Sequence, residues 1–175
     1  TDTISTHSTH VAGTLIGDGT ESINYGGTAL QWRGMAPNAQ LVSYGNTCGS
    51  VCFYNDSFEI ESDWQDATDN YAYDFATMSL GSNIGVNWYP CDWAGDYETS
   101  AELFDEMNTG SLGRNIIQFF AAGNDRNDRC WNYSNPDGYI TVGTPAVAKN
   151  PIVIGAINSD DLSMTDFSSW GPTDD

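Results

Sequence analysis

Positively charged side chains are scarce in this sequence. Its 175 residues include five basic side chains against 24 acidic ones, which gives a formal net charge of −19 at pH 7. The five are Arg33, Arg114, Arg126, Arg129 and Lys149. A surface that binds phosphate groups needs clustered Lys and Arg, so the composition excludes nucleic acid as a partner and disfavours an anionic membrane.

The sequence also lacks an apolar run of about 18 residues, the length that a membrane-spanning helix needs. No basic and then apolar leader precedes the first motif. The chain opens on polar residues immediately before that motif, so we expect sequence upstream of Thr1 to be missing or removed. Its length and its 39% hydrophobic content suffice for one domain with a core of its own.

Four cysteines are present, at Cys48, Cys52, Cys91 and Cys130. Four cysteines allow three pairings, and sequence alone does not choose among them. A metal site built of cysteine alone usually has two close pairs, whereas only Cys48 and Cys52 are close here. We favour disulfides Cys48–Cys52 and Cys91–Cys130 over free thiols or a metal site. Oxidised thiols would indicate an extracellular protein.

Short apolar strands alternate with helical patterns along the chain. The pattern predicts helices over 9–16 and 99–109, a helix from Ser57 with Ile60, Trp64, Ala67 and Tyr71 on one face, and strands over 41–44, 75–80, 115–122 and 152–157. This order is typical of an α/β domain with a mainly parallel sheet. Such sheets bind ligands beyond the C-terminal ends of their strands, where Gly81 and Gly123–Asn124 fall.

His7 lies where a loop turns into a helix of small residues. Imidazole transfers protons near neutral pH, so a general base is one interpretation of His7. A capping or packed histidine is another. A third is a metal pair with His10, because residues three apart share one helical face. The stretch itself leaves all three open.

Six short segments then occur in a fixed order, and together they carry a family resemblance. They are His7–Thr14, Gly34–Ala39, Met78–Gly81, Ala121–Asn124, Thr141–Pro145 and Phe167–Pro172. In this order they resemble the histidine box and the later conserved boxes of the subtilisin-like serine peptidases. The resemblance implies a three-layer α/β domain with a mainly parallel sheet, truncated at both ends, with residues 1–175 as a partial peptidase domain.

The resemblance also implies roles for individual residues. His7 would be the general base, which makes His10 structural, and Asn124 would donate its side-chain N–H to the oxyanion of a tetrahedral intermediate. Six residues would bind an extended peptide substrate or line the pocket for the side chain before the cut bond: Ser79, Leu80, Gly81, Ala122, Gly123 and Gly143. The plainer interpretations are turns at Gly81 and Asn124 and tight packing at the other small residues. Thr144–Pro145 matches a position at which the family has a cis peptide bond, so the resemblance implies a cis bond here.

Two departures from the family pattern stand out. Ser8 occupies a position where glycine is usual, and the family's catalytic Asp and Ser boxes do not occur in these 175 residues. Asp2 is too close to His7 to stand in for the acid. We therefore expect part of a secreted serine endopeptidase, inactive alone, whose partners are a peptide substrate and the remainder of its own peptidase domain.

Two other functions compete with this one. The chain could be a non-catalytic, subtilase-like extracellular binding or scaffold module, or an acidic metal-binding domain that uses His7, His10 and the loop Asp125–Asp128. The peptidase chemistry requires no cofactor and no catalytic metal. Structural calcium is common in the resembled family, but no ligand set in this sequence is specific enough to name.

Overall fold

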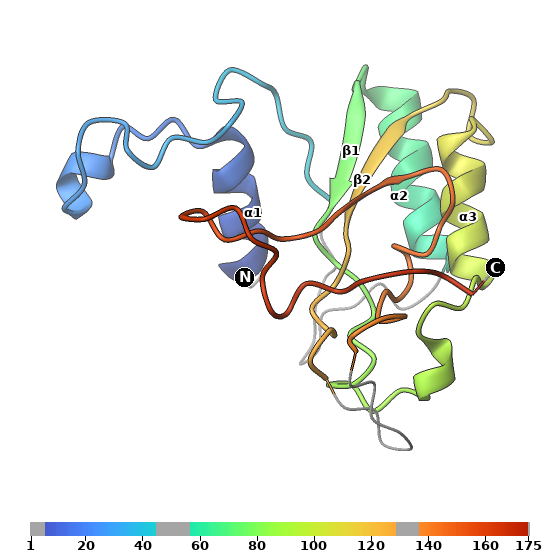
Figure 1. Cartoon of the computed structure of the whole chain (residues 1–175). Coiled ribbons are helices and arrows are strands. Elements are labelled where there is room, and N and C mark those ends of the chain that lie inside the picture. Colours follow the sequence, from blue (N-terminus) through green and yellow to red (C-terminus); the bar gives the residue numbers. More distant parts are fainter. Residues whose placement is uncertain (1–5, 45–56, 129–136, 175) are drawn as a thin grey trace. The chain divides into compact units, whose positions relative to one another are not determined.

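A computed structural model of the chain describes residues 6–44, 57–128 and 137–174 (Figure 1). The chain divides into two compact units, Thr1–Glu59 and Ile60–Asp175. Each unit is described by itself, and the assignment of residues 1–175 to one partial domain stays a prediction. None of the described helices is long and apolar enough to cross a membrane.

The first unit contains the predicted histidine-bearing helix. Helix α1 spans Thr6–Ile16, and a short 3₁₀ helix, η1, spans Ser22–Tyr25. The end of α1 is joined to the segment that follows Arg33: Met35 N donates to Thr14 O at 3.0 Å and Ala36 N donates to Leu15 O at 2.7 Å. These bonds satisfy carbonyl groups that a helix end leaves without partners. Two of the six matching segments are therefore in contact.

Gly34 lets these two segments approach. Its N–H donates to Gly17 O at 2.7 Å, and a Cβ atom at position 34 would lie only 2.7 Å from Gly17 N and 2.8 Å from Gly13 O. Both neighbours are backbone, so they cannot move aside as a flexible side chain would. Glycine is required here by the close approach.

The strand predicted over 41–44 is wrong. These residues are irregular in the structure, and Leu41 and Val42 are exposed. An apolar run forms a strand only where another strand supplies ladder hydrogen bonds, and periodicity alone does not reveal that partner.

The second unit is built on a parallel sheet. Strands β1, β2 and β3 span Phe75–Met78, Ile117–Ala121 and Ile152–Ile154 and lie in that order, with β2 in the centre. The pairing places Phe75 beside Ile117 and Phe119 beside Ile152. All three strands were predicted, although each is shorter than its apolar run. The predicted α/β class with a parallel sheet is confirmed.

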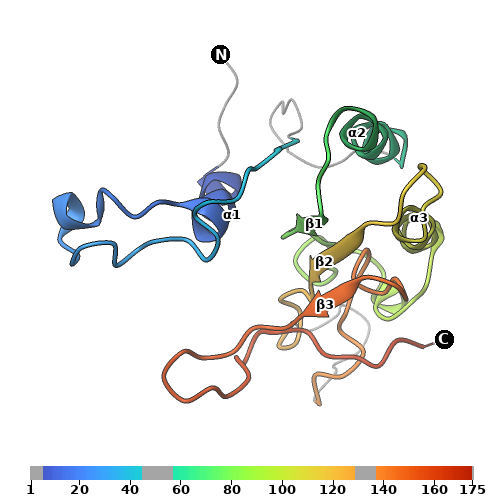
Figure 2. The same ribbon diagram turned by 90° about the horizontal axis from the view of Figure 1, so that it is seen from above.

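Helices α2 and α3 lie on the same side of this sheet (Figure 2). Helix α2 spans Ser57–Asn70 and α3 spans Thr99–Asn108, both as predicted, and a short 3₁₀ helix, η2, spans Cys91–Trp93. Tyr71 was expected on the inward face of α2, but the helix ends one residue earlier and Tyr71 is exposed.

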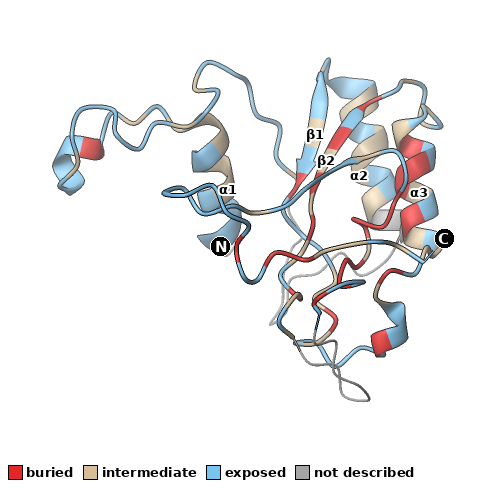
Figure 3. Ribbon diagram, viewed as in Figure 1, coloured by how far each residue is buried: buried red, intermediate tan, exposed pale blue. Residues whose placement is uncertain are grey.

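The core of the unit lies between β2 and the two helices. The ring of Phe104 on α3 meets Phe120 on β2 edge-on, with centroids 4.9 Å apart, and Trp64 on α2 meets Phe104 at 5.7 Å. Edge-to-face aromatic pairs of this kind add to the stabilisation from apolar burial. Buried residues lie on α3 and β2 (Figure 3), and a further group lies in the segment 141–148.

The opposite face of the sheet is apolar and exposed. The register puts Phe75, Ile117, Ile152 and Ile154 on this face, and all four are exposed. The expectation that β1 is a buried strand is therefore wrong for Phe75. The reason is that the two helices of this unit cover only the other face, on which Met78 and Phe120 are buried.

Cys91 is the one cysteine within the described ranges. It begins η2, is buried with 4% of its surface exposed, and is disulfide-bonded. Cys48, Cys52 and Cys130 lie outside the described residues, so both predicted pairings stay predictions.

Candidate active site

The predicted substrate-binding segment follows directly after β1. Ser79, Leu80 and Gly81 leave the sheet and are exposed. The next residue, Ser82, donates its N–H to Thr144 O at 2.8 Å, and a Cβ atom at Gly81 would lie 3.5 Å from that same oxygen. The structure thus brings two matching segments side by side, although they are about 60 residues apart in the sequence.

Gly143 lies at the centre of this contact. A Cβ atom at position 143 would lie 2.7 Å from Ser82 O and 3.4 Å from Ile84 Cδ1, and Ile84 is 3% exposed. Tight packing is therefore one reason for glycine here. Its predicted role in lining a specificity pocket stays a prediction.

The backbone around these residues agrees with the motif. The peptide bond Thr144–Pro145 is cis, as predicted, and Gly171–Pro172 is cis as well. Ala122 is buried, and its N–H extends the sheet by donating to Ile154 O at 2.9 Å. A pocket-lining role for Ala122 is not tested by this contact.

Asn124 lies in the turn that follows the central strand, between two anchored residues. Gly123 has φ +106°, and its carbonyl accepts from Ser169 N at 3.0 Å. Asp125 donates its N–H to Ser169 Oγ, also at 3.0 Å. Asn124 itself is exposed, whereas Asp125 and Ser169 are buried. Ser169 therefore fixes the backbone on both sides of Asn124, and Asn124 itself lies at the surface.

The side chain of Asp125 joins this turn to Ile84, three residues after the predicted substrate-binding segment. Its Oδ2 atom accepts from Ile84 N at 3.2 Å. Burial raises the pKa of Asp125 to about 6: the Ile84 N–H opposes this shift, and the nearby Asp128 carboxyl adds to it. Asp125 is thus a buried acid beside the proposed oxyanion donor.

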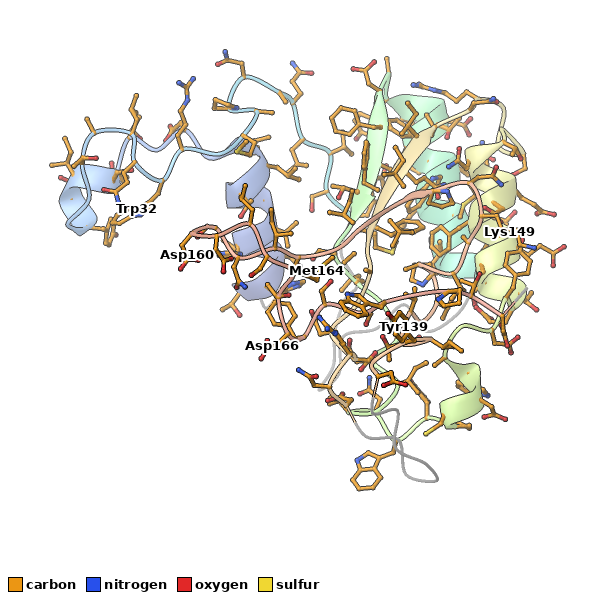
Figure 4. All side chains as sticks on the ribbon, viewed as in Figure 1. Trp32, Tyr139, Lys149, Asp160, Met164 and Asp166 are labelled. Atoms are coloured by element: carbon orange, nitrogen blue, oxygen red, sulfur yellow. The ribbon has the colours of Figure 1, made fainter. Side chains whose placement is uncertain are left out.

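Hydrogen bonds and ring contacts also fix the segment that contains Ser169. Trp170 N donates to Thr141 Oγ1 at 2.9 Å, and Thr141 N donates to Trp170 O at 2.9 Å. The Arg126 guanidinium lies 3.3 Å from the centre of the Trp170 ring. Tyr139, labelled in Figure 4, also packs on that ring, with centroids 5.3 Å apart and ring planes tilted by 52°.

His7 is the second residue of α1 and is exposed, as is His10 one turn further on. Because His7 belongs to the first unit and Asn124 to the second, a shared cleft for the two stays a prediction. Across the described ranges, no three His, Cys, Asp or Glu residues form a group that could hold a metal ion.

Sequence reasoning missed three residues of this site: Ile84, Asp125 and Ser169. Ser169 falls inside a matching segment, and Asp125 was considered only as part of an acidic loop. Their contacts join residues 41 and 44 positions apart. No local spacing encodes such a contact.

The parallel sheet and its helices define an α/β protein. The exposed segment Ser79–Gly81 and the anchored Asn124 each follow the end of a strand, where sheets of this kind bind their ligands. The model of the subtilase family, peptidase S8, matches residues 1–175, the whole chain. The chain belongs to the subtilase family, and the resemblance drawn from its six segments is confirmed.

Proposed function

We propose that the chain is part of a serine endopeptidase that hydrolyses peptide bonds by acyl transfer. Family membership supports serine peptidase activity. The observation that carries the residue assignments is the anchored turn around Asn124, which stands at the end of the central strand near the exposed segment Ser79–Gly81.

In this proposal His7 takes the proton from the attacking serine hydroxyl and returns it to the leaving amine. The side-chain N–H of Asn124 donates to the oxygen on which negative charge develops. The exposed backbone of Ser79–Gly81 binds the peptide in an extended form by strand addition. The attacking serine and the acid that orients His7 come from the remainder of the peptidase domain, and the chemistry needs no cofactor.

The test uses the longer gene product that supplies those two residues. Asn124→Leu should lower kcat by about 10²–10³, a magnitude measured on subtilisin itself, with little change in KM. Asn158→Leu is the matched control, because Asn158 is an exposed asparagine in another turn, where its amide donates to Ser163 Oγ at 2.9 Å. An unchanged kcat in Asn124→Leu would refute the oxyanion role.

A non-catalytic extracellular module is the second candidate. It is supported by the exposed segment Ser79–Gly81, which could bind an extended peptide by strand addition without any reaction. A fluorophosphonate probe separates the two functions: a labelled serine in the folded longer product supports the peptidase, and no labelling of that product supports the module.

We also propose that the protein is secreted and that Cys91 pairs with Cys130. The burial and oxidation of Cys91 support this. Mass spectrometry without reductant should find the chain lighter by four hydrogens, one for each of its four cysteines, and peptide mapping should link Cys91 to Cys130. Free thiols at all four positions would remove the argument for secretion.

A further inference from the structure

Asp125 and Asp128 are the first and last residues of a tight turn that directly follows Asn124, the proposed oxyanion donor. Asp128 N donates to Asp125 O at 3.0 Å, and Asp125 Oδ2 accepts from Ile84 N at 3.2 Å. The Asp128 side chain packs on Gly85, where a Cβ atom would lie 2.7 Å from Asp128 Cβ. Both acids therefore face the segment 84–85.

The hydrogen-bond partners of the two carboxyls are incomplete. Asp125 Oδ2 accepts from Ile84 N, but Asp125 Oδ1 and Asp128 Oδ2 are buried atoms that receive no donor from the described residues. Asp125 is only 5% exposed. A buried carboxylate oxygen without a donor is costly, and two such oxygens side by side are costlier still. A single proton between the carboxyls would give both oxygens a partner, and the neighbouring Asp128 carboxyl favours the protonated form of Asp125.

We propose that Asp125 is a positioning residue for Asn124, acting as one half of a carboxyl pair with Asp128 that shares a single proton. The inference rests on the proposed function of Asn124. The protonated pair closes the turn 125–128 onto the segment 84–85, while Ser169 holds the backbone on either side of Asn124. Loss of the shared proton leaves two like charges in a buried turn and loosens this arrangement.

Among the described residues, no positive charge faces the pair. The segment 82–85 contributes backbone N–H groups and no titratable side chain. Arg126 is directed elsewhere, with Nη1 donating to Thr165 O at 3.1 Å and its guanidinium over Trp170. Asp166, from the segment packed on the other side, is exposed, and Asp137 is exposed as well. Arg129, the next residue after Asp128, lies outside the described ranges.

The pair therefore keeps its shared proton up to about pH 6. Burial and the Asp128 carboxyl raise the pKa of Asp125 to about 6, close to the ordinary pKa of histidine, about 6.5. The geometry of Asn124 is then best at acid pH, whereas an imidazole base requires the loss of its proton at higher pH. Loss of the shared proton above about pH 6 should therefore lower kcat, because the turn then holds Asn124 less firmly.

The first test needs no activity. In the full 175-residue chain, the ¹³C resonance of the Asp125 carboxyl should titrate with a midpoint near 6. Asp128→Asn replaces the neighbouring carboxyl with a neutral amide of the same shape and should lower that midpoint by about one unit or more. Asp160→Asn makes the same charge change in an exposed loop (Figure 4) and should leave it unchanged. A wild-type midpoint near the ordinary 3.8 would overturn the proposal, whatever the variants do.

The second test uses the longer gene product and its pH profile. We expect the ratio of kcat in Asp128→Asn to kcat in the wild type to rise several-fold between about pH 5 and about pH 8, with little change in KM, because Asn124 acts on the transition state. A flat ratio in an active enzyme refutes the positioning role and leaves the proposed function standing. An inactive wild-type product refutes the proposed function, while the carboxyl titration still decides whether the pair shares a proton.

Discussion

The backbone N–H of Ser169 donates to the carbonyl oxygen of Gly123 at 3.0 Å, and the Ser169 hydroxyl accepts from the residue on the other side of Asn124. One buried serine thus holds both ends of the proposed oxyanion turn. The segment 167–170 therefore fixes the backbone of the turn although it supplies none of the proposed catalytic side chains.

Ser169→Ala should destabilise the chain by about 1–3 kcal/mol, because the buried N–H of Asp125 loses its acceptor. Urea unfolding followed by circular dichroism measures this as a lower midpoint at an unchanged slope. Ser111→Ala, at an exposed position after α3, is the control and should change stability little. Equal midpoints for the two variants would show that Ser169 does not fix the turn.

Gln118 is an unusual residue for the centre of a sheet. It is fully buried in β2, on the face toward the helices, and neither its Nε2 nor its Oε1 atom has a partner among the described residues. Gln118→Met keeps the length of the side chain and removes both polar groups, so it should stabilise the chain by about 1–3 kcal/mol. A thermal melt that shows Gln118→Met to be less stable would mean that the amide does have partners.

Much of the fold could be predicted because its signals are local. The spacing of Ile60, Trp64 and Ala67 predicts α2, and the apolar run before Gly123 predicts β2. The failures depend on partners distant in sequence. Leu41 and Val42 look like a strand but form none, and Phe75 looks buried although the helices of its unit cover the other face.

The sequence could point only to those candidate site residues that fall within a family segment. Asn124 and Gly143 were proposed because each falls in a family segment, and their roles stay predictions, although Gly143 does contact the segment 82–84. Asp125 and Ser169 were missed because their importance lies in contacts across more than 40 positions. A contact of that kind depends on the folded chain and leaves no periodic pattern.

Asp105, on α3, should make stability depend on pH in acid. Burial alone would raise its pKa, but N–H donors from Lys149 and Asn150 and the Tyr97 hydroxyl outweigh this and hold the pKa below its ordinary 3.8. A lowered pKa in the folded state stabilises the protein above the unfolded value, and this contribution is lost as pH falls through the folded value.

Asp105→Asn should therefore cost about 1.5–3 kcal/mol at neutral pH, the range for hydrogen bonds to a charged group, and should flatten the loss of stability below about pH 4. Urea midpoints at neutral pH and at several acid pH values measure both effects. Lys149, beside α3 in Figure 4, marks where the contact lies. If Asp105→Asn and the exposed Asp160→Asn gave the same pH dependence, the hydrogen bonds of Asp105 would not contribute as described.

The 175-residue chain by itself should not cleave peptides. In the proposed mechanism a serine supplies the attacking oxygen, and without it the residual catalysis is about 10³–10⁴ over water, too slow for a peptidase assay. The absent acid also leaves the tautomer of His7 unfixed. The purified chain should neither react with a fluorophosphonate probe nor turn over a fluorogenic peptide, whereas the longer gene product should do both. Stoichiometric labelling of a serine within this chain, such as Ser8 or Ser79, would show that the nucleophile lies among these residues and that the proposed division of the catalytic groups is wrong.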